Sequence, residues 1–261
     1  MAKVLSRAGV ASRRDAERLI EAGRVAVNGR RLDSPAVRVA PSDLVEVDGR
    51  PIAEPEPPRL WRYHKPAGVV TSARDEQGRP DLSAALPQGL PRVMPVGRLD
   101  LSSEGLLLLT NDGGLKRNLE LPAAGWLRRY RVRVRGRPSA ERLAPLKEGI
   151  AVPGPRGERV LYQPMEISLD PPQPGRAGAA NAWLTVGLRE GRNREIRRAM
   201  EAVGLSVNRL IRIAHGPFQL GDLPAGAVDE VRAKTLRAAL GVAAESPAAR
   251  ERRNRPARRG E

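Results

Sequence analysis

The stretch GRLDLSSEGLLLLTNDG, residues 97–113, decides how this chain folds and where its chemistry lies. Four consecutive leucines, Leu106 to Leu109, predict a buried core segment. Arg98 and Asp100 stand in the loop just before it. A charged pair beside a buried apolar run costs desolvation energy unless it is satisfied. The pair is therefore either a structural ion pair or part of a chemical site.

The composition predicts a folded protein with an acidic partner. With 261 residues, 40% of them hydrophobic, the chain has room for one large or two ordinary domains with a real core. The formal net charge is +16, and arginine carries nearly all of the excess. Arginine suits bidentate phosphate contacts, so nucleic acid is the expected partner. The abundance of Ala, Gly, Pro and Arg also fits a GC-rich coding bias.

Residue types absent from the chain exclude several functions. The sequence has no Cys and only two His, which excludes a thiol nucleophile and a disulfide framework and leaves too few ligands for a zinc site. The first residues do not resemble a signal peptide, and no apolar run reaches the ~20 residues needed to span a bilayer. We expect a cytoplasmic, monomeric protein without membrane contact.

Residues 1–50 read as a compact unit of two helices and small hairpins. Lys3 to Ala8 predicts the first helix, and Ser12 caps a second one with Asp15 at capping-box spacing. Asn-Gly at residues 28–29 and Asp-Gly at residues 48–49 predict tight turns.

This unit resembles an S4 RNA-binding domain, through KVLSRAGVASRR (residues 3–14), IEAGRV (20–25) and VNG (27–29). The resemblance implies that Ser12, Arg13 and Arg14 lie on the face that grips structured RNA through its phosphates. The alternative for these arginines is a solvated helix face, which is the usual fate of a charge run.

Two further boundaries follow from composition. Residues 51–59 contain four prolines and predict a semi-rigid linker, so a second domain is expected over residues 60–240. Residues 245–261 hold six arginines and almost no large apolar side chain, which predicts a disordered basic tail. Such a tail adds phosphate affinity without specifying a site.

The second domain is predicted to be α+β, built on a mixed, mainly antiparallel sheet flanked by helices and loops. Residues 129–135 alternate strictly, placing Tyr130 on the inward face and four arginines on the other. Residues 183–188 predict another strand. Asn193 is the expected cap of a helix over residues 194–203 that ends at Gly204.

Four segments in this domain resemble the pseudouridine synthases that act on ribosomal RNA. They are the opening stretch, YHKPAGVV (residues 63–70), Tyr130 in its strand, and EGRNREIRR (residues 190–198). Glu195, where small-subunit relatives tend to carry Gln, together with the basic tail, makes the chain most similar to the large-subunit branch. One departure stands out: the family's His-Pro pair and Lys ahead of its tyrosine are missing from residues 121–130, where Arg128 or Arg129 could replace the Lys.

The resemblance implies isomerisation of a specific uridine to pseudouridine, on ribosomal RNA or an assembling ribosomal subunit, without metal or cofactor. The nucleotide must be extruded into a pocket, at a cost of a few kcal/mol that contacts elsewhere repay. Asp100 would be the catalytic carboxylate, either as nucleophile or as base. Tyr130 would lie against the uracil, and Arg197 would be the charge opposing Asp100.

The remaining candidates are RNA contacts. Arg98 would fill the gap left by the flipped nucleotide or hold its phosphate. Lys65 precedes Pro66 and Gly68, so it is expected in a turn with an exposed amine. Arg192 and Arg194 are either substrate contacts or part of a solvated helix face.

Purely structural interpretations of the candidate residues remain open. Asp100 with Arg98 is compatible with a loop ion pair, and Tyr130 with plain strand core. Competing functions are a small-subunit rRNA pseudouridine synthase, a non-catalytic rRNA-binding assembly factor, and a double-stranded DNA binder. The last is disfavoured because no helix-turn-helix or zinc module accompanies the charge.

Overall fold

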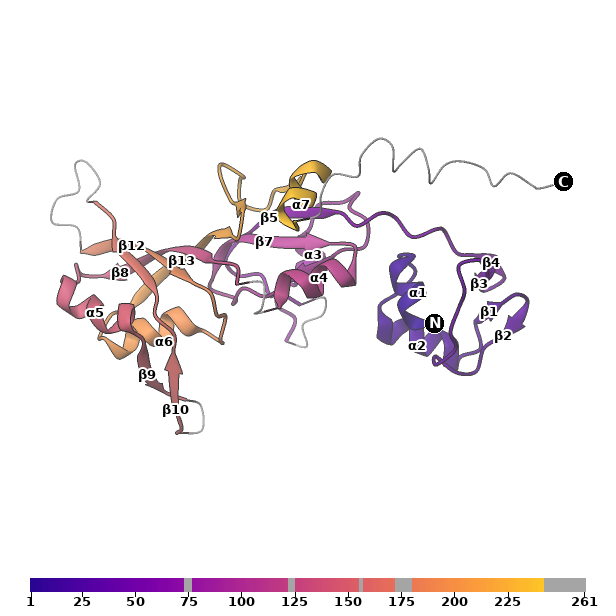
Figure 1. Ribbon diagram of the computed structural model, residues 1–261, viewed down its shortest axis with the longest axis horizontal. Coiled ribbons are helices and arrows are strands. Elements are labelled where there is room, and N and C mark those ends of the chain that lie inside the picture. The colour runs from indigo at the N-terminus through magenta and orange to yellow at the C-terminus, as the bar shows by residue number, and fades with distance from the viewer. Residues whose placement is uncertain (73–76, 122–124, 155–156, 172–179, 242–261) are drawn as a thin grey trace.

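The computed structural model describes residues 1–72, 77–121, 125–154, 157–171 and 180–241. An extended segment, residues 52–59, joins a small N-terminal unit to a larger sheet domain (Figure 1). The N-terminal unit contains α1 (Ala2–Arg7), α2 (Arg13–Glu21), β1 (Val25–Val27), β2 (Arg30–Arg31), β3 (Val45–Val47) and β4 (Arg50–Pro51). The sheet domain contains β5 (Leu60–Lys65), α3 (Leu82–Ala85), β6 (Met94–Val96), β7 (Glu104–Thr110), α4 (Gly113–Glu120), β8 (Arg128–Arg135), α5 (Ala140–Glu148), β9 (Ile150–Pro153), β10 (Arg159–Tyr162), β11 (Glu166–Leu169), β12 (Asn181–Leu188), α6 (Glu195–Ala202), β13 (Val207–His215), β14 (Phe218–Gln219), β15 (Val228–Glu230) and α7 (Ala233–Ala239).

Local rules explain the N-terminal unit. Ser12 is the N-cap of α2, and its Oγ accepts a hydrogen bond from the Asp15 amide at 3.1 Å, as predicted. Asn28 and Asp48 both have φ 52°, and each precedes a glycine in the turn of a hairpin. The strands pair in the order β2-β1-β3-β4. The apolar faces of the helices and strands meet in a core of their own, formed by Ala2, Leu5, Ala16, Ile20, Val25, Leu32 and Val45.

The sheet domain is organised by one large, mainly antiparallel sheet, as predicted. Within the described residues, the main path of this sheet runs β11-β12-β8-β13-β7-β5-β15, with β14 added to β13 and β6 added to β7. The pairing of β13 with β7 is parallel, and the other named pairings in the sheet are antiparallel. The chain must therefore return to the middle of the sheet late, which brings residues near 210 beside those near 105.

The leucine run is buried because β7 has packed side chains on both faces. Leu107 and Leu109 belong to the larger core, which includes residues of α5 and α6. Leu106 and Leu108 belong to a second core, which includes residues of α4 and α7. Because both faces of β7 are covered, its side chains do not alternate between apolar and polar, and all four leucines are fully buried.

The parallel seam between β7 and β13 depends on Gly105. This residue has φ 102°, and a Cβ built there would lie 2.3 Å from the Arg212 carbonyl oxygen. A side chain at position 105 would therefore have to push the two strands apart. Because the two strands lie so close at Gly105, β7 enters the centre of the sheet immediately after the Asp100 loop.

The N-terminal unit touches the sheet domain through polar contacts. Arg92 Nη1 donates to the Ala11 carbonyl oxygen at 2.6 Å, and Arg7 Nε lies 3.5 Å from Asp112 Oδ2. Exposed contacts of this kind contribute little stability each. The predicted basic tail, residues 245–261, lies outside the described residues. No helix in the described part of the chain is long and apolar enough to cross a bilayer.

Candidate active site

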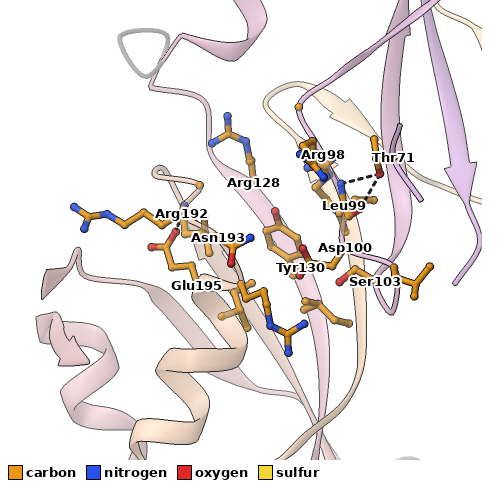
Figure 2. Close-up of a pocket in the computed structure, with 18 of the residues that line it drawn as sticks. Thr71, Arg98, Leu99, Asp100, Ser103, Arg128, Tyr130, Arg192, Asn193 and Glu195 are labelled. Carbon is orange, nitrogen blue, oxygen red and sulfur yellow. Dashed lines mark hydrogen bonds between the residues drawn. The ribbon is translucent and has the colours of Figure 1, made fainter. Parts of the chain in front are cut away.

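A cavity of about 760 Å³ opens over β8 and β13, between two loops. One wall is the Asp100 loop, residues 97–103, and the other is the arginine loop, residues 190–194, with the first turn of α6. In Figure 2 the Tyr130 ring stands between Asp100 and Ser103 on one side and Asn193 on the other. The cavity thus gathers Asp100, Tyr130, Arg98, Arg192 and Arg194, all of which were predicted from sequence.

Backbone contacts hold the Asp100 loop. Thr71 Oγ1 donates to the Leu99 carbonyl at 2.7 Å and accepts from the Leu99 amide at 3.2 Å (Figure 2). The Gly97 amide donates to Glu120 Oε1 at 2.6 Å, and the Gly68 amide donates to the Leu101 carbonyl at 2.8 Å. The loop backbone is therefore fixed on both sides of Asp100.

Lys65 is buried inside this loop rather than exposed, so the sequence expectation for its position was wrong. Its ammonium donates to the carbonyl oxygens of Pro66 at 2.9 Å, Ser103 at 2.9 Å and Asp100 at 3.3 Å. Burial lowers the pKa of Lys65 to about 8, against the attraction of Asp100 and Glu104. Lys65 thus holds the backbone around Asp100 from inside the protein through these hydrogen bonds.

The Asp100 carboxylate itself is left open. The side chain is half-buried and lines the cavity, and within the described residues no hydrogen bond or ion pair reaches its oxygens. A carboxylate with a fixed backbone and free oxygens is positioned to meet a ligand rather than to hold the fold. It does not pair with Arg98, which is exposed at the cavity rim.

Arg197 lies near Asp100 without an ion pair between them in the described residues. Its Nη2 donates to the Ser102 carbonyl at 3.1 Å and its Nη1 to the Val207 carbonyl at 3.2 Å. Burial and the neighbouring Arg194 lower the pKa of Arg197, and attraction to Asp100 opposes this shift. Arg197 therefore ties α6 to the Asp100 loop and adds positive potential there.

Two residues that line the cavity, Tyr130 and Arg212, belong to one ladder row of the sheet. Lys65 pairs with Gly105, Gly105 with Arg212, and Arg212 with Tyr130. Arg212 is 3% exposed, and its Nε donates to the Leu106 carbonyl at 2.6 Å. The sequence assigned Arg212 no role in the site, because its burial depends on the pairing of β13 with β7 and β8.

Arg128 occupies the position where the family's lysine is missing. It lines the cavity, and burial lowers its pKa. Arg129 instead is exposed and lies 3.8 Å from Glu166. The structure therefore places Arg128, not Arg129, at the site. His215, paired with Arg128 across the strands, is buried, and desolvation with two neighbouring arginines lowers its pKa to about 3.

The arginine loop ends differently from the prediction. Arg194, with φ 51°, is the N-cap of α6 and makes no side-chain cap hydrogen bond, so Asn193 is not the cap. The left-handed turn leaves Arg192, Asn193 and Arg194 exposed along the cavity. Glu195, which the sequence indicates only as a mark of similarity to the large-subunit branch of the family, is 4% exposed and also lines the cavity.

The three N-terminal candidates lie elsewhere. Ser12, Arg13 and Arg14 belong to the second helix of the N-terminal unit and do not line the cavity. Arg13 and Arg14 are exposed, and neither forms an ion pair within the part of the chain that the structure describes. The Ser12 side chain caps α2 and also donates a hydrogen bond to Asp15 Oδ2 at 2.6 Å.

Comparisons with known proteins agree with this division. The RNA pseudouridylate synthase profile matches residues 59–202, and the S4 domain profile matches residues 2–45. A Rickettsia prowazekii protein named as an uncharacterized RNA pseudouridine synthase is 44% identical over 236 residues, covering 90% of this chain and 95% of that protein.

Two further relatives are named ribosomal large subunit pseudouridine synthase B. The Bacillus subtilis protein is 37% identical, covering 90% of this chain and 94% of its own length. The Salmonella typhimurium protein is 39% identical, covering 88% of this chain and 78% of its own length. A crystal structure of a pseudouridylate synthase shares the fold, with a TM-score of 0.61 and 23% identity over 90% of this chain and 96% of that one. The chain is thus a pseudouridine synthase acting on RNA, and it belongs to the RNA pseudouridylate synthase family.

Proposed function

We propose that this enzyme converts a specific uridine of large-subunit ribosomal RNA to pseudouridine. The relatives named for the large ribosomal subunit match along most of the chain, which supports this RNA class. The net charge of +16 fits an RNA partner, free or within an assembling subunit.

The observation that carries the catalytic assignment is the open carboxylate of Asp100 facing the Tyr130 ring. In the reaction the bond from N1 of the base to C1′ of the ribose breaks, C5 bonds to C1′, C5 loses its proton and N1 gains one. Asp100 would act on the ribose, as nucleophile at C1′ or as base at C2′. Tyr130 would lie against the uracil and assist removal of the C5 proton.

The cationic residues divide the remaining work. Arg212, Arg128 and Arg197 place positive charge beneath and beside the site, where it favours an anionic substrate. Arg98 at the rim would occupy the space left by the extruded nucleotide or hold its phosphate. Arg192 and Arg194 on the arginine loop would hold flanking phosphates.

The N-terminal unit would supply binding energy at a distance from the site. Arg13 and Arg14 on α2 would contact phosphates of folded RNA, with Ser12 fixing the start of that helix. Extruding a base costs a few kcal/mol, and phosphate contacts away from the cavity offset that cost.

The test is to incubate the enzyme separately with large-subunit and small-subunit rRNA transcripts and to map pseudouridine by carbodiimide-dependent reverse-transcription stops. We expect a new stop in the large-subunit transcript, absent with Asp100→Asn and retained with Asp222→Asn, an exposed aspartate outside the cavity. A stop in the small-subunit transcript alone would redirect the substrate assignment. No stop in either transcript, with RNA binding intact, would favour an assembly factor.

A further inference from the structure

Two carboxyl groups, one lining the cavity and one just behind it in the chain, flank the arginine loop, and one of their oxygens has no donor. Glu190 ends the segment after β12, and Glu195 begins α6. Both side chains bind Arg192, Glu190 through the guanidinium and Glu195 through the backbone amide, and the two carboxyl groups interact with each other. Glu195 is 4% exposed and lines the cavity beside Asn193 (Figure 2).

Three of the four carboxyl oxygens have a donor. Glu190 Oε1 accepts from the Gln163 amide at 2.7 Å, and Glu190 Oε2 accepts from Arg192 Nε at 2.9 Å. Glu195 Oε2 accepts from the Arg192 amide at 2.8 Å (Figure 2). The fourth oxygen, Glu195 Oε1, is buried and has no donor.

A proton on Glu195 completes this arrangement. Two ionised carboxylates offer each other only acceptors, whereas a protonated Glu195 can donate to Glu190. An unpaired buried carboxylate oxygen is otherwise costly. Burial, followed by the neighbouring Glu190, raises the pKa of Glu195 to about 8, and the donors around Glu190 keep its own pKa lowered.

The charges that face the pair do not replace this proton. Arg192 from the same loop pairs its side chain with Glu190 and gives Glu195 only its backbone amide. Arg128 from β8 attracts Glu195 but donates its Nη1 to the Arg189 carbonyl at 3.2 Å. Arg194, which precedes Glu195, is exposed.

We propose that Glu190 and Glu195 share one proton and serve as positioning residues, holding Arg192, Asn193 and Arg194 in the conformation that receives the RNA. The proposal rests on the proposed function, since it assigns the arginine loop to the rRNA substrate. The loop is closed at both ends by this pair: Glu195 binds the Arg192 amide, and Glu190 binds the Arg192 side chain. The left-handed Arg194 between them depends on that closure.

Loss of the proton opens the loop. Above pH 8 the pair carries two negative charges without a hydrogen bond between them. Their repulsion drives apart the two side chains that hold Arg192, so the arginines lose their fixed position. The fraction of enzyme with a closed loop falls about tenfold between pH 7 and pH 9, and KM for rRNA rises by the same factor while kcat changes less.

The experiment compares wild type with Glu195→Gln, whose amide supplies a permanent donor, and with Glu195→Ala, which has none. Glu201→Gln, an exposed glutamate in the same helix, is the matched control. Turnover is followed by tritium release from rRNA labelled at uracil C5, between pH 6 and pH 9.5. Thermal unfolding without RNA is measured over the same range.

We expect the alkaline rise in KM for wild type and Glu201→Gln, a change below about twofold for Glu195→Gln, and a raised KM at every pH for Glu195→Ala. The unfolding midpoint of wild type should fall relative to Glu195→Gln as pH rises from 6 to 8, because only the folded state retains this proton in that range.

Identical unfolding profiles for wild type and Glu195→Gln would overturn the shared proton. Different unfolding profiles with the same rise in KM would overturn the positioning role. Absence of turnover by wild type on rRNA at every pH would instead count against the proposed substrate, and the unfolding profiles would still decide the shared proton.

Discussion

The two walls of the cavity use carboxylates in opposite ways. In the Asp100 loop the backbone is held by Lys65, Thr71 and Glu120, while the Asp100 oxygens remain free. In the arginine loop the carboxyls of Glu190 and Glu195 hold the backbone and side chain of Arg192, and the cationic ends remain exposed.

The difference fits the proposed division, in which the Asp100 loop performs catalysis and the arginine loop binds the RNA. A reacting carboxylate gains from a rigid backbone, because small displacements of a catalytic group are costly in rate. A phosphate-binding loop gains from long cationic side chains that adapt to RNA while their base stays fixed. Changes in the first wall should therefore alter kcat, and changes in the second should alter KM.

Asp100→Asn should give the largest effect. Loss of the reacting carboxylate should lower kcat by at least about 10²–10⁴-fold with the affinity for rRNA unchanged, since no contact to the fold is lost. Tritium release gives the rate and filter binding gives the affinity, with Asp222→Asn as control. A parallel loss of affinity or folding would show that Asp100 is structural.

Lys65→Met should destabilise the Asp100 loop. Removing the ammonium leaves three buried carbonyl oxygens without a donor, at about 1–3 kcal/mol each before relaxation. We expect the free energy of unfolding in urea to fall by about 3 kcal/mol and kcat to fall with it. Lys234→Met, at an exposed lysine of α7, should change neither quantity.

The pH dependence of this variant sharpens the test. Because the folded-state pKa of Lys65 is about 8, below the ordinary 10.5, the unfolded chain binds more protons between these values. The free energy of unfolding of wild type should therefore gain a rising contribution from pH 8 to pH 10.5. A Lys65→Met profile with the same slope as wild type would place the titration elsewhere.

Arg192→Ala with Arg194→Ala should affect the second wall. Loss of two phosphate contacts should raise KM for rRNA about tenfold at moderate salt and reduce the salt dependence of binding, with kcat close to that of wild type. The control is Arg135→Ala with Arg137→Ala, which removes the same charge from exposed positions outside the cavity. An equal effect in both double variants would show that the arginine loop contributes only general positive charge to RNA binding.

Ser12→Ala should have the smallest effect, since it lies outside both walls. Loss of the cap should lower the stability of α2 by about 1 kcal/mol, visible in amide hydrogen exchange. Turnover at saturating rRNA should be unaffected. Ser12→Asp, which restores an acceptor at the cap, should recover the protection.

Features set by neighbouring residues could be predicted from the sequence. The Ser12 cap needs only the amide three residues on, and the turns at Asn28 and Asp48 need only the following glycine. The alternation around Tyr130 likewise predicts which face is buried. The members of the site were found by family resemblance, which groups residues that spacing alone leaves far apart.

The failures share one physical cause, which is contact with distant segments. Lys65 is buried because the carbonyls of Asp100 and Ser103 reach it from more than thirty residues away. Arg212 and Glu195 look exposed in their local patterns and are buried by strand pairing and by the arginine loop. Arg194 replaced Asn193 as cap through a left-handed conformation that no local rule assigns to arginine.

Gly105 has a consequence for how this sequence tolerates change. In a saturation mutagenesis screen scored by growth or turnover, position 105 should be as intolerant as position 100, yet for a different reason. Every side chain at 105 meets the Arg212 backbone, so its variants should be lost from the folded pool, whereas Asp100 variants should accumulate as inactive protein. Scoring abundance beside activity would separate a residue that closes the sheet from one that reacts.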